Sequence, residues 1–212
     1  MRLGLLGGSF NPIHRCHLSI ARSARQLLQL DRVLFIPTGD PPHKQPGTLA
    51  TASHRHRMVQ LAIEDTPEFA LTDLEIRRSG KSYSIDTVRA IQQEYGPDTV
   101  LFFIIGLDAF LDLPSWKEAD TLLKSCHFVV ISRPSTSFQA MAAIPLFRDV
   151  PQTTLTALDE VRQERADVAI TNGQALTFLR LPPCDVSASE IRARLRSGAS
   201  LANLLPTPVE SY

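Results

Sequence analysis

The chain has 212 residues, of which 43% are hydrophobic and 21% charged, as is typical of a globular protein with one large α/β domain. Basic and acidic residues number 22 each, and a net charge of zero argues against a general nucleic-acid-binding surface. The sequence holds no apolar run of the roughly 18 residues that a membrane span needs, and we expect that its first residues are not a signal peptide. Three widely spaced cysteines, Cys16, Cys126 and Cys184, do not suggest a disulfide framework, so we expect a cytoplasmic protein.

Short apolar runs alternate with helical patterns along the chain. In the first half, the spacing predicts strands and helices in the order Arg2–Leu6, Arg15–Leu30, Arg32–Ile36, Ser53–Ile63, Phe69–Ile76 and Ser84–Tyr95. The later elements are expected at Thr99–Ile105, Ala119–Lys124, His127–Ser132, Leu176–Leu179 and Ser187–Ser197. Residues 135–172 have no assignable pattern. The alternation predicts one doubly wound, Rossmann-like parallel sheet with helices on both faces, in a single domain over residues 1–212.

The segment from Leu6 to Leu18 has the features of a phosphate site. It follows the first strand and precedes the first helix, and ligands of such sheets bind at the carboxyl ends of strands. Gly7 and Gly8 allow the backbone to approach a ligand, and the helix start presents unpaired N–H groups to an anion. His14 and His17 are three residues apart, so both can face one anion. A plain strand-to-helix turn with two surface histidines is the alternative.

Two further segments can bind parts of a nucleotide. Ser187, Ser189 and Arg192 begin the last long helix, where Ser187 with Glu190 also forms a capping box. Gly106 and Asp108 follow a buried strand, and the single tryptophan, Trp116, can stack on a planar ring or lie in the core.

The remaining polar loops are ambiguous one by one. Pro41–Lys44, Ser82–Ser84 and Ser132–Pro134 each resemble an ordinary loop with a solvated cation, and we expect Arg55 and Arg57 on a solvated helix face. Gly80-Lys81-Ser82 lacks the upstream glycine of a P-loop. A zinc site at His14, Cys16 and His17 lacks a fourth ligand at usable spacing.

Taken together, these segments resemble the bacterial nicotinate-nucleotide adenylyltransferases, a family of the HxGH nucleotidyltransferase superfamily. The histidine segment follows the pattern GG[ST]F[DN]PxHxGH, with Cys16 in place of the glycine between the histidines. The other segments are similar to the family's ISSTxIR, GxD…W, PPHK, SYT and RP motifs, in the same order. The resemblance spans nearly the whole chain, with 135–172 as its weak zone.

The resemblance implies adenylyl transfer from ATP to nicotinate mononucleotide, giving deamido-NAD and pyrophosphate. Its catalytic residues would be His14, His17 and Arg192. Residues 187–212 would complete an ATP site whose members are Gly7, Gly8, Ser9, Phe10, His14, His17, Gly106, Asp108, Ser187, Ser189 and Arg192. Mg²⁺ is expected, held mainly by the phosphates of ATP rather than by protein ligands.

The acceptor site implied by the resemblance consists of Lys44, Ser84, Asp108, Trp116 and Arg133. Lys44 and Arg133 would meet the mononucleotide phosphate, Asp108 the ribose and Trp116 the pyridine ring, while Ser84 would offer its N–H to the nicotinate carboxylate. The expected partners are these two substrates, with neither nucleic acid nor membrane, and the oligomeric state is not indicated.

Two alternatives stay open. The acceptor could be nicotinamide mononucleotide, because the choice between the two depends on a carboxylate contact that a sequence does not reveal. Alternatively, the protein could be a nucleotide-binding module whose catalysis is weakened because Cys16 replaces the motif glycine.

Overall fold

The computed structural model describes residues 1–42, 47–133, 136–148, 150–170 and 174–212. The chain divides into two compact units. We call Leu3–Tyr83 with Cys184–Tyr212 the histidine unit, and Met1–Arg2 with Ser84–Pro183 the tryptophan unit. Each is described by itself.

The histidine unit contains a parallel sheet. Strand β1 (Arg2–Gly8) pairs with β2 (Arg32–Pro37), and β2 pairs with β3 (Phe69–Leu71). The middle residues of β1 and β2 are buried because apolar side chains occupy both faces of these strands, as is usual for parallel strands. Gly8 lies opposite Pro37, so the loops that follow β1 and β2 leave the sheet at the same edge.

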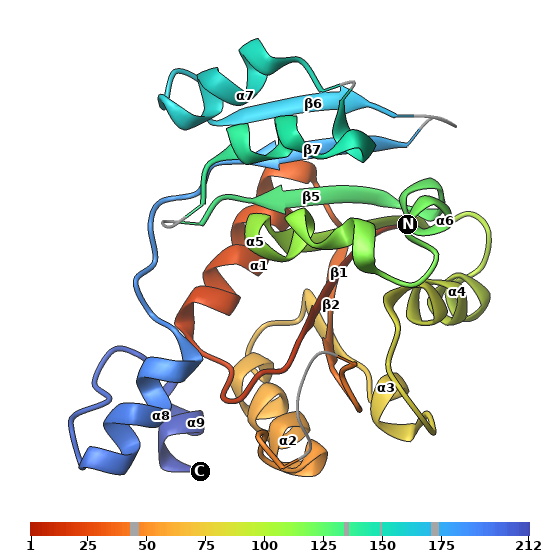
Figure 1. Ribbon diagram of the computed structural model, residues 1–212. Coiled ribbons are helices and arrows are strands. Elements are labelled where there is room, and N and C mark those ends of the chain that lie inside the picture. The colour runs from red at the N-terminus through yellow and green to blue at the C-terminus, as the bar shows by residue number, and fades with distance from the viewer. Residues whose placement is uncertain (43–46, 134–135, 149, 171–173) are drawn as a thin grey trace. The chain divides into compact units, whose positions relative to one another are not determined.

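Helices belong to the same unit as these strands. They are α1 (Arg15–Leu28), α2 (Ala52–Ile63), α3 (Leu74–Arg77), α8 (Ala188–Ser197) and α9 (Thr207–Ser211). Helices α8 and α9 lie near α2 rather than on the strands (Figure 1). Helix α1 buries the stripe Leu18, Ala21, Ala24 and Leu28, and it ends where Gln29 takes the left-handed conformation. Helix α9 packs against α2, so the end of the chain lies on this unit.

The tryptophan unit has a mixed sheet. Strands β4 (Val100–Gly106), β5 (His127–Ile131) and β7 (Ala175–Leu179) are parallel, and β6 (Arg165–Ala169) pairs with β7 in the antiparallel direction. Gly106, Ile131 and Leu179 are in register, so these three parallel strands end at one edge.

The helical segments of the tryptophan unit are short. They are α4 (Ser84–Tyr95), α5 (Leu107–Leu111), η1 (Leu113–Ser115), α6 (Ala119–Ser125), η2 (Phe138–Ala143), η3 (Pro145–Phe147) and α7 (Gln152–Asp159). The buried aromatic rings of Phe110 and Phe147 stack 4.5 Å apart and join α5 to η3. Among the described residues, no helix is both long and apolar enough to cross a membrane.

The α/β class, the parallel strands and the flanking helices confirm the expected fold class. One local prediction is wrong, and several elements were not predicted. The strand expected over Phe69–Ile76 stops at Leu71, because the chain then turns into α3. The unassigned segment holds α7 and β6, and α5 was not predicted at all, since its five residues are too few to show a helical period.

Candidate active site

The histidine loop lies at the end of β1, as the sequence predicts. His14 precedes the first residue of α1, and His17 lies in its first turn. The two imidazole rings are 3.8 Å apart between centroids. The Nδ1 atom of His17 accepts the backbone N–H of His14 at 3.2 Å, so the neutral ring carries its hydrogen on Nε2. The two rings therefore form one unit at the amino end of a 14-residue helix.

Phe10 packs against the His17 ring of this pair. Its ring is 2% exposed and meets the ring of His17 edge to face, with centroids 5.1 Å apart. A Cβ atom at Gly8 would lie 3.2 Å from the Phe10 ring, so the absence of a side chain there lets the aromatic ring pack against the strand. Gly7 has no heavy atom within 4 Å of such a Cβ. Packing therefore explains Gly8, whereas Gly7 borders open space.

The start of α8 lies beside the histidine loop within the same unit (Figure 1). Arg192 donates from Nη1 to the backbone oxygen of Asn11 at 2.6 Å and from Nη2 to Ser189 Oγ at 3.2 Å. Ser187 caps the helix by accepting the N–H of Glu190 at 3.1 Å. The Glu190 carboxylate pairs with Arg194 at 2.8 Å. The structure thus brings Ser187, Ser189 and Arg192 to the loop that carries the histidines.

Arg55 corrects an expectation, because its side chain is buried rather than solvated. It is 2% exposed, and its guanidinium donates to the backbone oxygens of Ser9, Thr38 and Ala50 at 2.9, 2.7 and 3.0 Å. Burial lowers its pKa from the usual value, while the charge of Glu75 acts in the opposite direction. Arg55 therefore ties the loop after β1 to the loop after β2. Arg57 is exposed as expected.

The buried face of α2 could have revealed Arg55. It lies four residues before Val59 and eight before Ile63, both of which are buried on the same helix. That spacing places all three side chains on one face. The charge of Arg55 suggested a solvated position, but its place on the buried face of α2 determines its surroundings.

The cysteines correct a second expectation. Cys16 and Cys184 form a disulfide, with Cα atoms 5.8 Å apart and 168 residues between them in sequence. Such a separation hides the pairing in the sequence, because proximity is created only by the fold. Cys16 lies in the helical backbone of α1, so the position needs no glycine conformation. Its sulfur is part of the disulfide and is not a thiolate ligand for zinc.

In the tryptophan unit, Gly106, Asp108 and Arg133 meet at the ends of β4 and β5. Asp108 Oδ1 and Arg133 Nε are 3.4 Å apart in an exposed ion pair. A Cβ atom at Gly106 would lie 2.5 Å from the Asp108 carboxylate and 2.8 Å from Arg133 Nε, so a side chain there would displace this pair from its present arrangement. The sequence predicted each residue separately, and the strand register brings them together.

The other predicted acceptor residues have different surroundings. Trp116 follows η1, is half-buried, and meets the Phe103 ring edge to face at 6.3 Å. Ser84 is the first residue of α4, where helix N–H groups lack intrahelical partners. Lys44 lies outside the described residues.

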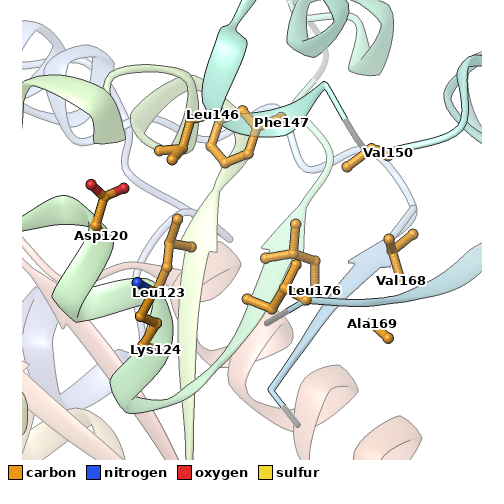
Figure 2. A pocket seen from close by; sticks show the side chains of 10 residues that line it. Asp120, Leu123, Lys124, Leu146, Phe147, Val150, Val168, Ala169 and Leu176 are labelled. Atoms are coloured by element: carbon orange, nitrogen blue, oxygen red, sulfur yellow. The ribbon is translucent and has the colours of Figure 1, made fainter. Parts of the chain in front are cut away.

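A cavity of about 340 Å³ in the tryptophan unit is separate from all of these residues. Leu146, Phe147, Val150 and Leu176 give it an apolar wall, and Asp120 and Lys124 of α6 are its charged members (Figure 2). It contains no predicted site residue. Its position beneath η3 identifies it as part of the packing between α6 and the sheet rather than as the candidate site.

Comparison with known proteins assigns the chain to a family. The model of the cytidylyltransferase-like family matches residues 5–194. The "Probable nicotinate-nucleotide adenylyltransferase" of Geobacter metallireducens is 42% identical over 212 residues, covering all of this chain and 95% of that protein. The chain belongs to the nicotinate-nucleotide adenylyltransferase family. A family member of the same name from Moorella thermoacetica is 36% identical over the whole chain and 88% of its own length.

Solved structures agree with this family fold. The Plasmodium falciparum nicotinic acid mononucleotide adenylyltransferase complexed with NaAD has a TM-score of 0.71 at 19% identity, covering 99% of this chain and 93% of that one. A nicotinate-nucleotide adenylyltransferase structure from Vibrio parahaemolyticus gives a TM-score of 0.63 at 17% identity, with coverages of 99% and 90%. At these identities the likeness concerns the fold.

Proposed function

We propose that the protein transfers the adenylyl group of ATP to nicotinate mononucleotide, forming deamido-NAD and releasing pyrophosphate. The observation that carries the proposal is the paired imidazoles of His14 and His17 at the start of α1, in a chain 42% identical over its full length to a relative named for this reaction. Because the reaction consumes ATP, we place the protein in the cytoplasm.

The reaction needs no nucleophile from the protein. An oxygen of the mononucleotide phosphate attacks the α-phosphorus of ATP in line, and the bond from that phosphorus to the β-phosphate oxygen breaks. The attacking phosphate is already ionised at neutral pH, so no general base is required. Positioning and stabilisation of negative charge are the tasks left to the side chains.

We assign these tasks in the histidine unit to two groups. His14 and His17 would contact the phosphates at which charge develops, supported by the N–H groups at the start of α1. Ser187, Ser189 and Arg192 would hold the β- and γ-phosphates, which leave as pyrophosphate. Gly7, Gly8, Ser9 and Phe10 form the loop that the triphosphate would approach, and residues 187–212 complete this ATP site.

In the tryptophan unit, Gly106 and Asp108 would contribute to nucleotide binding at the ribose. Arg133 would meet the mononucleotide phosphate, Trp116 would stack on the pyridine, and Ser84 would receive the nicotinate carboxylate on its N–H. Such a contact would favour nicotinate mononucleotide over nicotinamide mononucleotide as acceptor, in line with the name of the relatives.

We treat Mg²⁺ as part of the ATP substrate. In the ranges that the structure describes, His, Cys, Asp and Glu side chains do not gather in groups of three or more that could hold a metal ion. Phosphate oxygens and water are suitable Mg²⁺ ligands, so the ion would arrive with the triphosphate and reduce its charge.

Pyrophosphate release from MgATP tests the proposal, with nicotinate and nicotinamide mononucleotides compared in parallel. We expect release with the nicotinate form, and a loss of about 10²-fold in turnover for His17→Ala, the usual scale for a lost transition-state contact. His56→Ala, also on α2, is the matched control and should retain activity. ATP binding without release for either acceptor would instead identify a binding module.

A further inference from the structure

The Cys16–Cys184 disulfide joins two parts of the proposed ATP site. Cys16 is next to His17 in the first turn of α1, and Cys184 precedes the helix cap Ser187 by three residues. The bond therefore fixes the distance between the histidine segment and the segment that leads into α8. It lies where the chain re-enters the histidine unit, at the boundary after Pro183.

Reversible contacts join the same two segments. Arg192 donates to the Asn11 oxygen, and Arg15 donates from its backbone N and from Nε to the oxygens of Leu204 and Leu205 at 3.1 and 3.0 Å. Each is a hydrogen bond that can exchange with water. The disulfide is the covalent member of this set, so breaking it releases the α8 segment from a fixed anchor and leaves hydrogen bonds to hold it.

The two cysteines differ in access. Cys16 is 2% exposed, whereas Cys184 is on the surface. A soluble thiol can therefore attack the Cys184 sulfur, and a disulfide that a soluble thiol can reach is readily exchanged. Cytoplasmic disulfides are commonly transient and redox-sensing, which favours reversibility in the compartment we propose.

We propose that the Cys16–Cys184 disulfide is a reversible cross-link that raises the affinity of the protein for the triphosphate of ATP. Formation consumes one molecule of a small disulfide and yields two small thiols. The Cys184 thiolate attacks the small disulfide, forming a mixed disulfide and releasing one thiol. The Cys16 thiolate then attacks the Cys184 sulfur and releases the second thiol. Reduction follows the reverse order.

The direction of the effect follows from preorganisation. With the cross-link intact, Ser187, Ser189 and Arg192 are held beside the histidine segment before ATP binds. Without it, binding must also order the α8 segment, and that loss of freedom reduces the affinity. This inference rests on the proposed function only in assigning those three side chains to ATP phosphates.

The first experiment measures the dissociation constant of MgATP without an acceptor, by calorimetry, in the Cys126→Ser protein. Cys126 is buried, and burial raises its pKa to about 12, so the substitution removes an unreactive thiol and leaves the pair alone. Oxidised and reduced samples should show zero and two titratable thiols. We expect reduction to raise the dissociation constant about fivefold or more, the lower range of typical coupling between sites.

Single substitutions in the same background provide the controls. Cys16→Ser and Cys184→Ser should each bind ATP like the reduced protein and be insensitive to reductant. The double substitution should be no weaker than either single one, because all three remove the same bond.

A second readout distinguishes coupling to ATP from general stabilisation. If the disulfide tightens ATP binding by some factor, bound ATP must shift the thiol–disulfide equilibrium toward the disulfide by the same factor. We expect saturating MgATP to multiply the ratio of oxidised to reduced protein in a glutathione buffer by that factor. A cross-link that only stabilises the fold would leave this equilibrium unchanged.

Several outcomes would contradict the proposal that the disulfide forms reversibly and raises the affinity for ATP. Two titratable thiols that persist in an oxidising glutathione buffer would do so. So would equal ATP affinities of the two redox states while Arg192→Ala weakens binding, and the proposed function would then stand. If Arg192→Ala also binds ATP normally, the assigned phosphate contacts fail and the inference falls with them. Redox-dependent ATP binding without pyrophosphate release would uphold the cross-link and contradict the catalytic proposal.

Discussion

Arg55 illustrates how one residue can hold the loops of a site without belonging to it. Its guanidinium donates to the backbone oxygens of Ser9, which follows β1, and Thr38, which follows β2. The Ser9 oxygen lies in the loop that leads from β1 to His14 and His17. Arg57, only two residues later, is exposed and bonds to Gln60 on its own helix. The two arginines lie on the same helix, but Arg55 is buried and connects two loops, whereas Arg57 is exposed and bonds within the helix.

We predict that Arg55→Met destabilises the protein by about 2–4 kcal/mol, because three part-buried hydrogen bonds are lost and each contributes about 0.5–1.5 kcal/mol. Arg57→Met, the matched control, should change the free energy of unfolding by about 0.5 kcal/mol or less. Urea denaturation of both variants measures the difference. Equal stabilities for the two variants would contradict the role given to Arg55.

At the scale of elements, α8 combines two functions in one residue. Ser187 caps the helix, and it is also a proposed ligand of the ATP phosphates. Aspartate caps helices about as well as serine, but its charge opposes a phosphate. A substitution can therefore separate the cap from the binding site.

We predict that Ser187→Asp keeps the stability of the protein and weakens MgATP binding by about tenfold, whereas Ser187→Ala lowers the stability by about 1 kcal/mol. Thermal denaturation and ATP titration of the two variants check this pair of results. Unchanged ATP affinity in Ser187→Asp would leave Ser187 as a helix cap alone.

Strand β5 begins with a part-buried histidine, His127. His127 Nδ1 accepts the N–H of Ala175 at 3.0 Å, and its ring stacks on Phe102 at 4.9 Å. Burial lowers the pKa of His127 below the ordinary value of histidine, and the charge of Arg2 contributes in the same direction. The unfolded chain therefore binds a proton at a higher pH than the folded chain, so acidification favours unfolding.

We predict that the free energy of unfolding falls as the pH drops below about 6.5 and that His127→Gln reduces this slope. The slope persists down to the lowered pKa of the folded state, below which both states are protonated. Denaturant titrations between pH 7.5 and pH 5 measure it. His54→Gln is the control and should retain the slope; an unchanged slope in His127→Gln would contradict the assignment.

At the scale of the whole molecule, the disulfide closes a loop of the chain that contains Ser84–Pro183, the larger segment of the tryptophan unit. Closing so long a loop restricts the unfolded chain more than the folded one. The chain-entropy model gives a stabilisation of about 5 kcal/mol for a separation of this size, which is the upper end of observed values.

We predict that reduction lowers the free energy of unfolding of the Cys126→Ser protein by several kcal/mol, up to about 5. Urea denaturation with and without reductant tests this, and the Cys16→Ser protein should be unaffected by the reductant. A change of under about 1 kcal/mol would mean that the unfolded chain gains little freedom when the bond breaks.

The local chemistry of the sequence determined the elements and the family. Apolar runs and helix caps predicted α1, α4 and α8 to within two residues, because these signals come from neighbours in the chain. The histidine loop could be recognised for the same reason: its glycines, proline and histidines are consecutive, and they occur between a strand and a helix.

Only the tertiary structure decided which distant residues meet. The pairing of Cys16 with Cys184, the burial of Arg55 and the meeting of Asp108 with Arg133 all depend on the strand register and the return of the chain after residue 183. The antiparallel direction of β6 is another such case. Local propensity acts over a few residues, whereas these contacts join segments up to 168 residues apart, and their energies exist only once the sheets have formed.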